Sequence, residues 1–340
     1  MGDHYLNMNF LVDRSTTSNN VCIFVKYLTT IILKMIKKLD DIFEVLKAQE
    51  KKRLVAAFAN DSHTISAVSE AIDLGLVTGT LVGDELTIAK TCELEGIDMA
   101  KFTIVHEPDE MKAATKAVVL INDGEGNLLM KGLVSTDKYM RAILNKETGL
   151  MNPGAVLSHV TVIENANYHK LLIVGDVAII PAPEIKEKIA IVKYLIQVAR
   201  SLGIKEPKVA IIGATEQVSI KMVSTTDAAI ISKMADRGQI QGGFVDGPLA
   251  LDVAIDKESA EIKKISGKVA GDADCLVFPN IETGNVFYKT NTKLAQSELG
   301  AIVMGARVPA VLSSRGDSTK TKLYSIALAA LVAKDRKSVV

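Results

Sequence analysis

The sequence predicts an α/β protein built on a mostly parallel sheet. From residue 51 onward, short β-rich runs alternate with helical segments, a spacing typical of parallel strands joined by helical crossovers. Gly, Ala, Val and Ile are frequent while aromatic residues make up only 4%, which suits helices packed closely on a sheet that is buried on both faces. At 340 residues the chain is long enough for two compact domains.

The first half of the chain shows this alternation most clearly. Strands are expected at 54–59, 80–83, 102–105 and 128–130, and helices at 62–74, 85–95, 108–121 and from about residue 137. An amphipathic helix precedes them, and its apolar face carries Ile36, Leu39, Ile42, Phe43 and Leu46.

In the second half, Pro153 and Gly154 mark a crossover. Three strands at 159–163, 171–174 and 177–180 follow with no helix between them, which predicts that this part of the sheet is antiparallel. The remaining strands are expected at 209–212, 243–245, 275–278, 301–304 and 309–312, and the helices at 184–202, 217–235 and 318–333.

Residues 1–34 have a different character. Their apolar run from Val21 to Leu33 is interrupted by Lys26, so it is too short and broken for a membrane span, and it lacks the features of a secretory signal. We expect the folded protein to begin near Met35, and residues 1–34 to be an extension.

The charge balance and the cysteines exclude several classes of function. Lys+Arg and Asp+Glu both number 40, so no basic excess indicates nucleic-acid binding. Cys22, Cys92 and Cys275 are far apart and form no CxxC pair, so no metal site is predicted. Unpaired cysteines indicate a reducing cytoplasm.

Three polar clusters follow predicted strands. The first is the turn Leu312-Ser-Ser-Arg-Gly-Asp317, which opens a helix. Gly316 lets the backbone approach a ligand closely, and the helix start offers N–H groups to an anion. Arg315 supplies a positively charged, planar guanidinium group that donates hydrogen bonds in a fixed geometry. An ordinary helix capped by Asp317 or Ser318 is the alternative.

The second cluster runs from Phe278 to Lys289, and the third from Lys131 to Arg141. Asn280, Glu282, Asn285, Tyr288 and Lys289 give the second more polar groups than a short turn needs, although capping explains Asn280 and Thr283. In the third, Thr136 or Asp137 is expected to cap a helix that carries Arg141, which is either a ligand-binding or a solvated arginine. Neither GxxxxGK[ST] nor a strand-to-helix GxGxxG occurs.

Taken together, these clusters resemble the phosphate acetyltransferase and phosphate butyryltransferase family. The resemblance is closest to the butyryl type and runs from about Met35 to the end. It is carried by Gly132-Leu-Val-Ser135 with Arg141, Asp246-Gly-Pro-Leu-Ala-Leu-Asp252, Phe278-Pro-Asn-Ile-Glu-Thr-Gly-Asn285 with Tyr288-Lys289, and Ser314-Arg-Gly316.

The resemblance implies two α/β domains with a cleft between them, as in isocitrate and isopropylmalate dehydrogenases. Residues 35–150 and 306–340 would form domain 1, and residues 151–305 domain 2. It also implies the reversible reaction of acyl-CoA with phosphate to give acyl phosphate and coenzyme A, with a short acyl group of butyryl size. Coenzyme A is then a substrate, no cofactor is needed, and a cytoplasmic homo-oligomer (a dimer or larger) is expected.

The implied site contains the catalytic residues Ser314, Arg315 and Asp317. Phosphate and coenzyme A would contact Ser135, Thr136, Arg141, Asn280, Glu282, Asn285, Tyr288, Lys289 and Gly316. Acetyl-type members place an aspartate base seven residues after the serine, where this chain has Thr321, so the base stays open between Asp317 and none. Two alternatives remain: a dehydrogenase on the same scaffold, and a non-catalytic regulator that binds coenzyme A or another anion.

Overall fold

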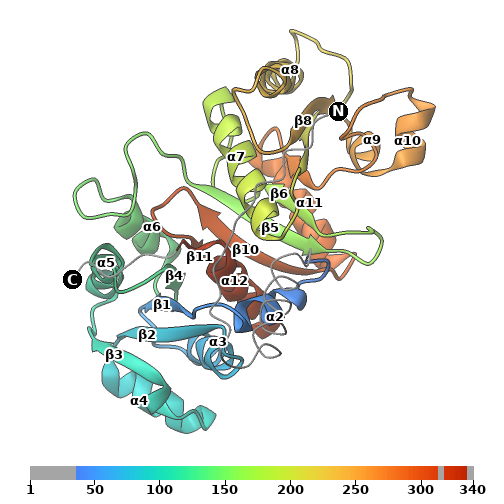
Figure 1. The fold of residues 1–340 in the computed structure, drawn as a ribbon. Helices are drawn as coiled ribbons and strands as arrows, with labels where there is room; N and C mark the ends of the chain where they lie inside the picture. Colours follow the sequence, from blue (N-terminus) through green and yellow to red (C-terminus); the bar gives the residue numbers. More distant parts are fainter. Residues whose placement is uncertain (1–35, 313–317, 335–340) are drawn as a thin grey trace, which may run out of the picture. The chain divides into compact units, whose positions relative to one another are not determined.

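The computed structural model describes residues 36–312 and 318–334. The extension predicted at residues 1–34 lies outside them. Within the described ranges the strands form one mixed sheet, in the order β3-β2-β1-β4-β11-β10-β5-β6-β9-β7-β8 (Figure 1).

The strands are β1 (Lys52–Ala57), β2 (Val77–Gly83), β3 (Phe102–His106), β4 (Leu128–Lys131), β5 (Ser158–Glu164), β6 (Leu172–Gly175), β7 (Lys208–Ile212), β8 (Phe244–Leu249), β9 (Cys275–Val277), β10 (Glu298–Met304) and β11 (Ala310–Val311). The helices are α2 (Asp41–Lys47), α3 (Ser62–Asp73), α4 (Glu85–Glu95), α5 (Glu110–Asn122), α6 (Thr136–Leu144), α7 (Ile185–Ser201), α8 (Val223–Asp236), α9 (Leu251–Ile255), α10 (Lys257–Ile262), α11 (Ile281–Lys293) and α12 (Thr319–Val332).

Strand direction divides the sheet into two groups. β3, β2, β1, β4 and β11 are parallel, and so are β6, β9, β7 and β8. β10 and β5 join the groups by antiparallel pairing. The carboxyl ends of the two parallel groups therefore point to opposite edges of the sheet.

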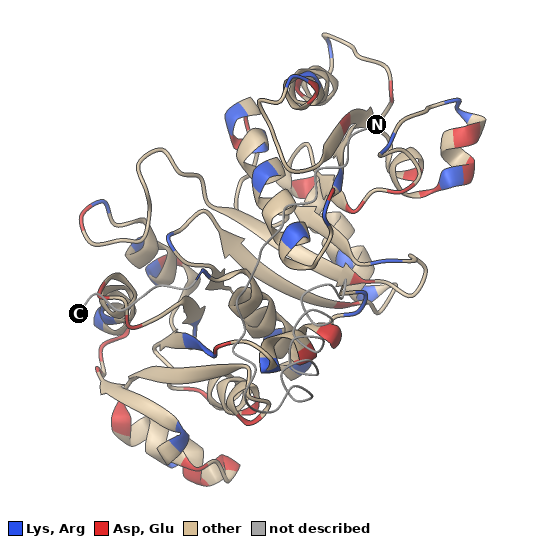
Figure 2. Cartoon of the chain, in the orientation of Figure 1, with Lys and Arg blue, Asp and Glu red and all other residues tan. Residues whose placement is uncertain are grey.

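Both faces of the sheet are buried, as expected for parallel strands. Along β1, Leu54 and Ala56 belong to a core shared with α2, α3 and α12, whereas Val55 and Ala57 belong to a core shared with α5 and α6. A third core lies between the β6–β9 region and α9 to α11. Figure 2 shows the strands almost free of charged residues, which gather on the outer helices and loops. The predicted α/β class is confirmed.

Helix α12 is buried on nearly all sides and occupies the middle of the fold in Figure 1. Its Tyr324 hydroxyl donates to Asp40 Oδ1 at 2.6 Å, ahead of α2, and its Ser325 Oγ accepts the Ala301 N–H of β10 at 2.9 Å. α12 also packs on α3, β11 and β4. Helix α12 therefore fixes the positions of β10, β11 and β4 relative to one another.

Most predicted elements are present, and β5 and β6 form the expected antiparallel pair. The strand predicted at 177–180 is wrong. The buried Asp176 carboxylate accepts the N–H groups of Ala178 and Ile179 at 2.7 and 2.8 Å, and these bonds turn the chain away from the sheet. α8 begins at Val223 rather than near 217, and the short helices α9 and α10 had no clear sequence signal. No helix in the described ranges is long and apolar enough to cross a membrane.

The division into two domains stays a prediction. Strands from both predicted parts are hydrogen-bonded into the same sheet, where β10 of the second part pairs with β11 of the first.

An ion-pair cluster ties together the amino ends of β6, β7 and β9. Asp272 accepts from Lys170 at 2.8 Å, from His169 at 2.9 Å and from Lys208. Partial burial opposes ionisation of Asp272, but the hydrogen bonds from Lys170 and Lys208 outweigh it and hold the pKa of the carboxyl well below its usual range.

We expect Asp272→Asn to lower the free energy of unfolding by about 1 kcal/mol at pH 7, because the carboxylate is partly exposed and its ion pairs are screened. A lowered folded-state pKa stabilises the fold above the unfolded-state pKa of about 4, and this contribution is lost as the pH falls further. Urea unfolding from pH 3 to 8 should therefore show the difference disappearing below about pH 4. A pH-independent difference, or an equal loss in Asp236→Asn at an exposed helical pair, would contradict this role.

Candidate active site

The strands that precede two of the three polar clusters, β4 and β11, are neighbours in the sheet. The strands pair in parallel, with Ala310 opposite Leu129 and Val311 opposite Met130. The Tyr139 hydroxyl of α6 contacts the carbonyl oxygens of Leu129 and Val311 at 3.3 and 3.4 Å, so α6 closes over both strands. The two strands therefore end side by side at one carboxyl edge of the sheet, where ligands bind in open α/β sheets.

The turn after β4 depends on Gly132. Its N–H donates to the Ala57 carbonyl of β1 at 3.0 Å, and the next N–H, of Leu133, donates to the Phe58 carbonyl at 2.8 Å. A Cβ at position 132 would lie 2.5 Å from the Phe58 carbonyl oxygen, so only glycine allows this approach.

Ser135 begins α6 as its N-cap by accepting the N–H of Lys138 at 3.4 Å, so the expected caps Thr136 and Asp137 are wrong. The Ser135 N–H donates to Glu110 of α5 at 2.6 Å, and Glu110 also binds the Lys138 ammonium. The Lys138 and Ser135 hydrogen bonds lower the pKa of Glu110. Ser135 thus fixes the start of α6 against α5.

Thr136 and Arg141 are exposed on α6. The Arg141 Nε lies 3.0 Å from Asp137 Oδ2, one helical turn earlier, and both side chains are about 70% exposed. In the present geometry the arginine thus belongs to a solvated pair, and it would have to leave Asp137 to meet a substrate.

The predicted catalytic residues Ser314, Arg315 and Asp317, together with Gly316, lie outside the described residues. The helix that follows them is α12. Ser318 is its N-cap and accepts the Thr321 N–H at 3.0 Å. The Thr321 hydroxyl also lies 3.0 Å from Ser318 Oγ, so Thr321 contributes to the cap.

The second cluster is divided by helix α11. Asn280 is the N-cap, and its Oδ1 accepts from the Thr283 N–H and hydroxyl at 3.0 and 2.6 Å. Glu282 is exposed in the first turn, and the Asn285 amide donates to the Val177 carbonyl at 3.2 Å. These residues lie at the carboxyl end of β9, at the edge opposite to that of β11, and the structure does not bring them into the cavity described next.

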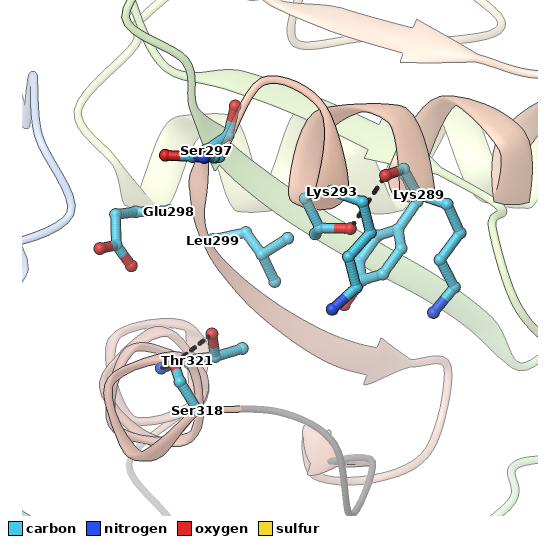
Figure 3. A pocket seen from close by; sticks show the side chains of 10 residues that line it. Lys289, Lys293, Ser297, Glu298, Leu299, Ser318 and Thr321 are labelled. Atoms are coloured by element: carbon cyan, nitrogen blue, oxygen red, sulfur yellow. Dashed lines mark hydrogen bonds between the residues drawn. The ribbon is translucent and has the colours of Figure 1, made fainter.

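Tyr288 and Lys289 lie further along α11 and face a cavity of about 400 Å³. Its walls come from the second half of α11, the start of β10 and the first turn of α12, as Figure 3 shows. The lining residues are Tyr288, Lys289, Thr292, Lys293, Gln296, Ser297, Glu298, Leu299, Ser318 and Thr321. The cavity therefore reaches the first turn of α12.

The cavity carries a net positive charge. Lys289 and Lys293 point in the same direction from α11 toward α12 (Figure 3), and no carboxylate of the described residues lies within 4.0 Å of either ammonium. Glu298, the one acidic lining residue, is engaged by Lys320 at 3.2 Å. Like charges four residues apart destabilise a helix slightly, and a bound polyanion would relieve this repulsion. The sequence analysis missed Lys293, although its four-residue spacing from Lys289 was a usable signal.

This fold and site define the class of protein. The chain belongs to the phosphate acetyl/butaryl transferase family, whose model matches residues 100–330. The predicted resemblance is confirmed, and with it an enzyme of the phosphate butyryltransferase kind that transfers an acyl group between coenzyme A and phosphate.

Three relatives illustrate the similarity. A phosphate butyryltransferase from Clostridium acetobutylicum is 48% identical over 302 residues, which is 89% of this chain and all of the relative. The crystal structure of a branched-chain phosphotransacylase from Enterococcus faecalis V583 is 31% identical, covers 83% of this chain and 99% of that one, and superposes with a TM-score of 0.72. A 4-hydroxythreonine-4-phosphate dehydrogenase from Klebsiella pneumoniae, 13% identical over 84% of this chain and all of its own, has a TM-score of 0.51, which shows a shared fold alone.

The position of α11 depends on Gly284. A Cβ there would lie 2.2 Å from the Asp176 carbonyl oxygen and 3.0 Å from the Phe278 ring. We expect Gly284→Ala to lower the free energy of unfolding by about 2 kcal/mol, because the start of α11 must move off the sheet. Thermal or urea unfolding measures this, with Val286→Ala, at a position that is 65% exposed, as a control that should change by less than about 0.5 kcal/mol. Equal stabilities of the two variants would show that the close approach is not needed.

Proposed function

We propose that this enzyme transfers a four- or five-carbon acyl group between coenzyme A and inorganic phosphate. The observation that supports the proposal is the parallel pairing of β4 with β11, which brings the carboxyl ends of both strands to one edge of the sheet, where α12 begins beside a positively charged cavity. Phosphate and coenzyme A are both anions, and one site must bind them next to each other.

In the direction of acyl phosphate formation, a phosphate oxygen attacks the thioester carbonyl carbon. A tetrahedral oxyanion forms, the carbon–sulfur bond breaks, and coenzyme A leaves as a thiolate that takes up a proton. The oxyanion needs N–H or cationic partners, and the thiolate, with a pKa near 8.5, gains from a nearby positive charge or an acid.

The residue roles follow from the family resemblance. We assign Arg315 and Arg141 to phosphate and to the oxyanion, and Ser314 to a hydrogen bond with the sulfur. Asp317 is the candidate base. Thr321 occupies the position of the aspartate in acetyl-type members, and its engagement in the cap of α12 argues against a role as base. Arginine suits phosphate because its planar fork donates two parallel hydrogen bonds.

The cavity beside α11 fits the nucleotide end of coenzyme A. Its phosphate groups carry several negative charges, and Lys289 and Lys293 supply two positive charges that no described carboxylate neutralises. Tyr288 adds a half-buried ring next to Lys289, whose ammonium lies 5.1 Å from the ring centre.

The acyl chain length rests on the relatives. The names of the Clostridium and Enterococcus proteins refer to butyryl and branched-chain groups, so we assign substrates of this size to the present enzyme. A cytoplasmic homo-oligomer, the expectation from the sequence, stays a prediction.

The proposed activity predicts phosphate-dependent release of coenzyme A from butyryl-CoA, followed as free thiol. Butyryl-CoA and C5 branched acyl-CoA should give kcat/KM values at least about tenfold above acetyl-CoA, which corresponds to a gain of about 1.4 kcal/mol from the added methylene groups. Arg315→Ala should remain folded and lose turnover. The absence of phosphate-dependent thiol release from every C2–C5 acyl-CoA would overturn the proposal.

The role of the cavity predicts that Lys289→Met with Lys293→Met raises KM for acyl-CoA about 30-fold and leaves KM for phosphate unchanged. Two partly exposed ion contacts of about 1 kcal/mol each give this factor. The salt dependence of KM for acyl-CoA should weaken as well. Lys233→Met, on the exposed face of α8, is the matched control, and an unchanged KM in the double variant would place the nucleotide elsewhere.

A further inference from the structure

Helix α12 carries a buried lysine to which the residue roles above assign nothing. Lys322 lies in the first turn and is only 4% exposed, whereas its neighbour Lys320 has a side chain that is 52% exposed. Its N–H donates to the Ser318 carbonyl at 3.1 Å, so the backbone here is regular helix. A lysine is almost never buried to this extent unless its charge is paired.

The contacts of neighbouring residues show where Lys322 points. Ser325 faces β10 and Tyr324 faces α2. At 100° per residue, Lys322 lies about 60° from Ser325 on the side away from Tyr324, which is the side of β11 and β4, both in contact with α12. Helical side chains lean toward the amino end of their helix. The ammonium is therefore directed to the carboxyl ends of β11 and β4.

No partner for this ammonium is present among residues 36–312 and 318–334. None of their carboxylates lies within 4.0 Å of it, and none of their acceptors bonds to it. A buried charge without a partner is strongly unfavourable. Every enclosed side-chain nitrogen and oxygen of the described residues has a hydrogen-bond partner, so the ammonium of Lys322, which has none, must keep contact with solvent, where an anionic ligand can reach it.

A second buried lysine lies at the same edge of the sheet. Lys131 is the last residue of β4 and is 7% exposed, and its ammonium donates to the Gly132 carbonyl at 3.1 Å. Helix α12 also directs its amino end here, and the amino end of a helix favours negative charge. Two lysines and a helix start thus belong to elements that meet at the carboxyl ends of neighbouring parallel strands.

We propose that Lys322 binds the inorganic phosphate that the reaction consumes, and the same phosphoryl group in the acyl phosphate. This inference rests on the proposed function and adds a residue for the acceptor phosphate. A lysine is a compact point charge that suits phosphate in a buried site. Lys322 does not line the cavity of Lys289 and Lys293, so the acceptor phosphate and the phosphates of coenzyme A are held by different lysines.

Kinetics with each substrate varied in turn test the assignment. Lys322→Met keeps the length of the side chain and removes the charge, so KM for phosphate should rise about 10- to 100-fold while KM for acyl-CoA stays within twofold. Lys322→Arg should recover part of the loss. Lys320→Met, in the same turn but exposed and paired with Glu298, should leave KM for phosphate unchanged. An unchanged KM for phosphate in Lys322→Met would overturn the inference.

Binding without turnover separates this inference from the proposed function. Inorganic phosphate alone should raise the melting temperature of the wild-type protein, compared with chloride at equal ionic strength, and the increase should be absent in Lys322→Met. If the wild type shows this increase but releases no thiol from any acyl-CoA, the proposed function fails and the anion site stands. If wild type and Lys322→Met respond equally to phosphate, Lys322 is a structural residue and the inference fails.

Discussion

The parallel pairing of β11 with β4 is the constraint on which the candidate site depends. It joins two stretches that lie about 180 residues apart in the sequence, and each is followed in the sequence by one of the predicted polar clusters. The Tyr139 hydroxyl stabilises the pairing of β4 with β11 by contacting a carbonyl oxygen of each strand. Without this pairing, Ser135 at the start of α6 and Ser318 at the start of α12 would follow strands that share no edge, and the proposed site would not be assembled.

Helix α12 connects this edge to the rest of the molecule. Its capped start borders the cavity, its middle is bonded to β10 through Ser325, and Tyr324 links it to the residues before α2. A helix buried on nearly all sides has little freedom to shift. Positioning binding groups on such an element gives the precision that acyl transfer needs, because small displacements of reacting groups cost large factors in rate.

Much of the fold could be predicted from the sequence because its signals are local. The alternation of apolar runs and helices gave the class, and Ser318 was one of two caps expected for α12. The strand predicted at 177–180 was wrong because the apolar residues there resemble a strand, whereas the Asp176 carboxylate binds the backbone and turns the chain. The neighbourhood of β4 and β11 and the burial of Lys322 are tertiary facts that no local pattern contains. Asn280, in contrast, caps α11 through Thr283, which is the local role that its turn sequence indicated.

The sequence separation between β4 and β11 also bears on how the enzyme is made. On the ribosome, β4 emerges well before β11 and α12. Its free edge and the core that α12 later fills are therefore exposed while about 180 further residues are translated, which takes roughly 9 to 36 s at about 5 to 20 residues per second. Such an unpaired strand edge is prone to aggregation. The nascent chain is therefore a natural client for chaperones, and activity can arise only after α12 has been synthesised.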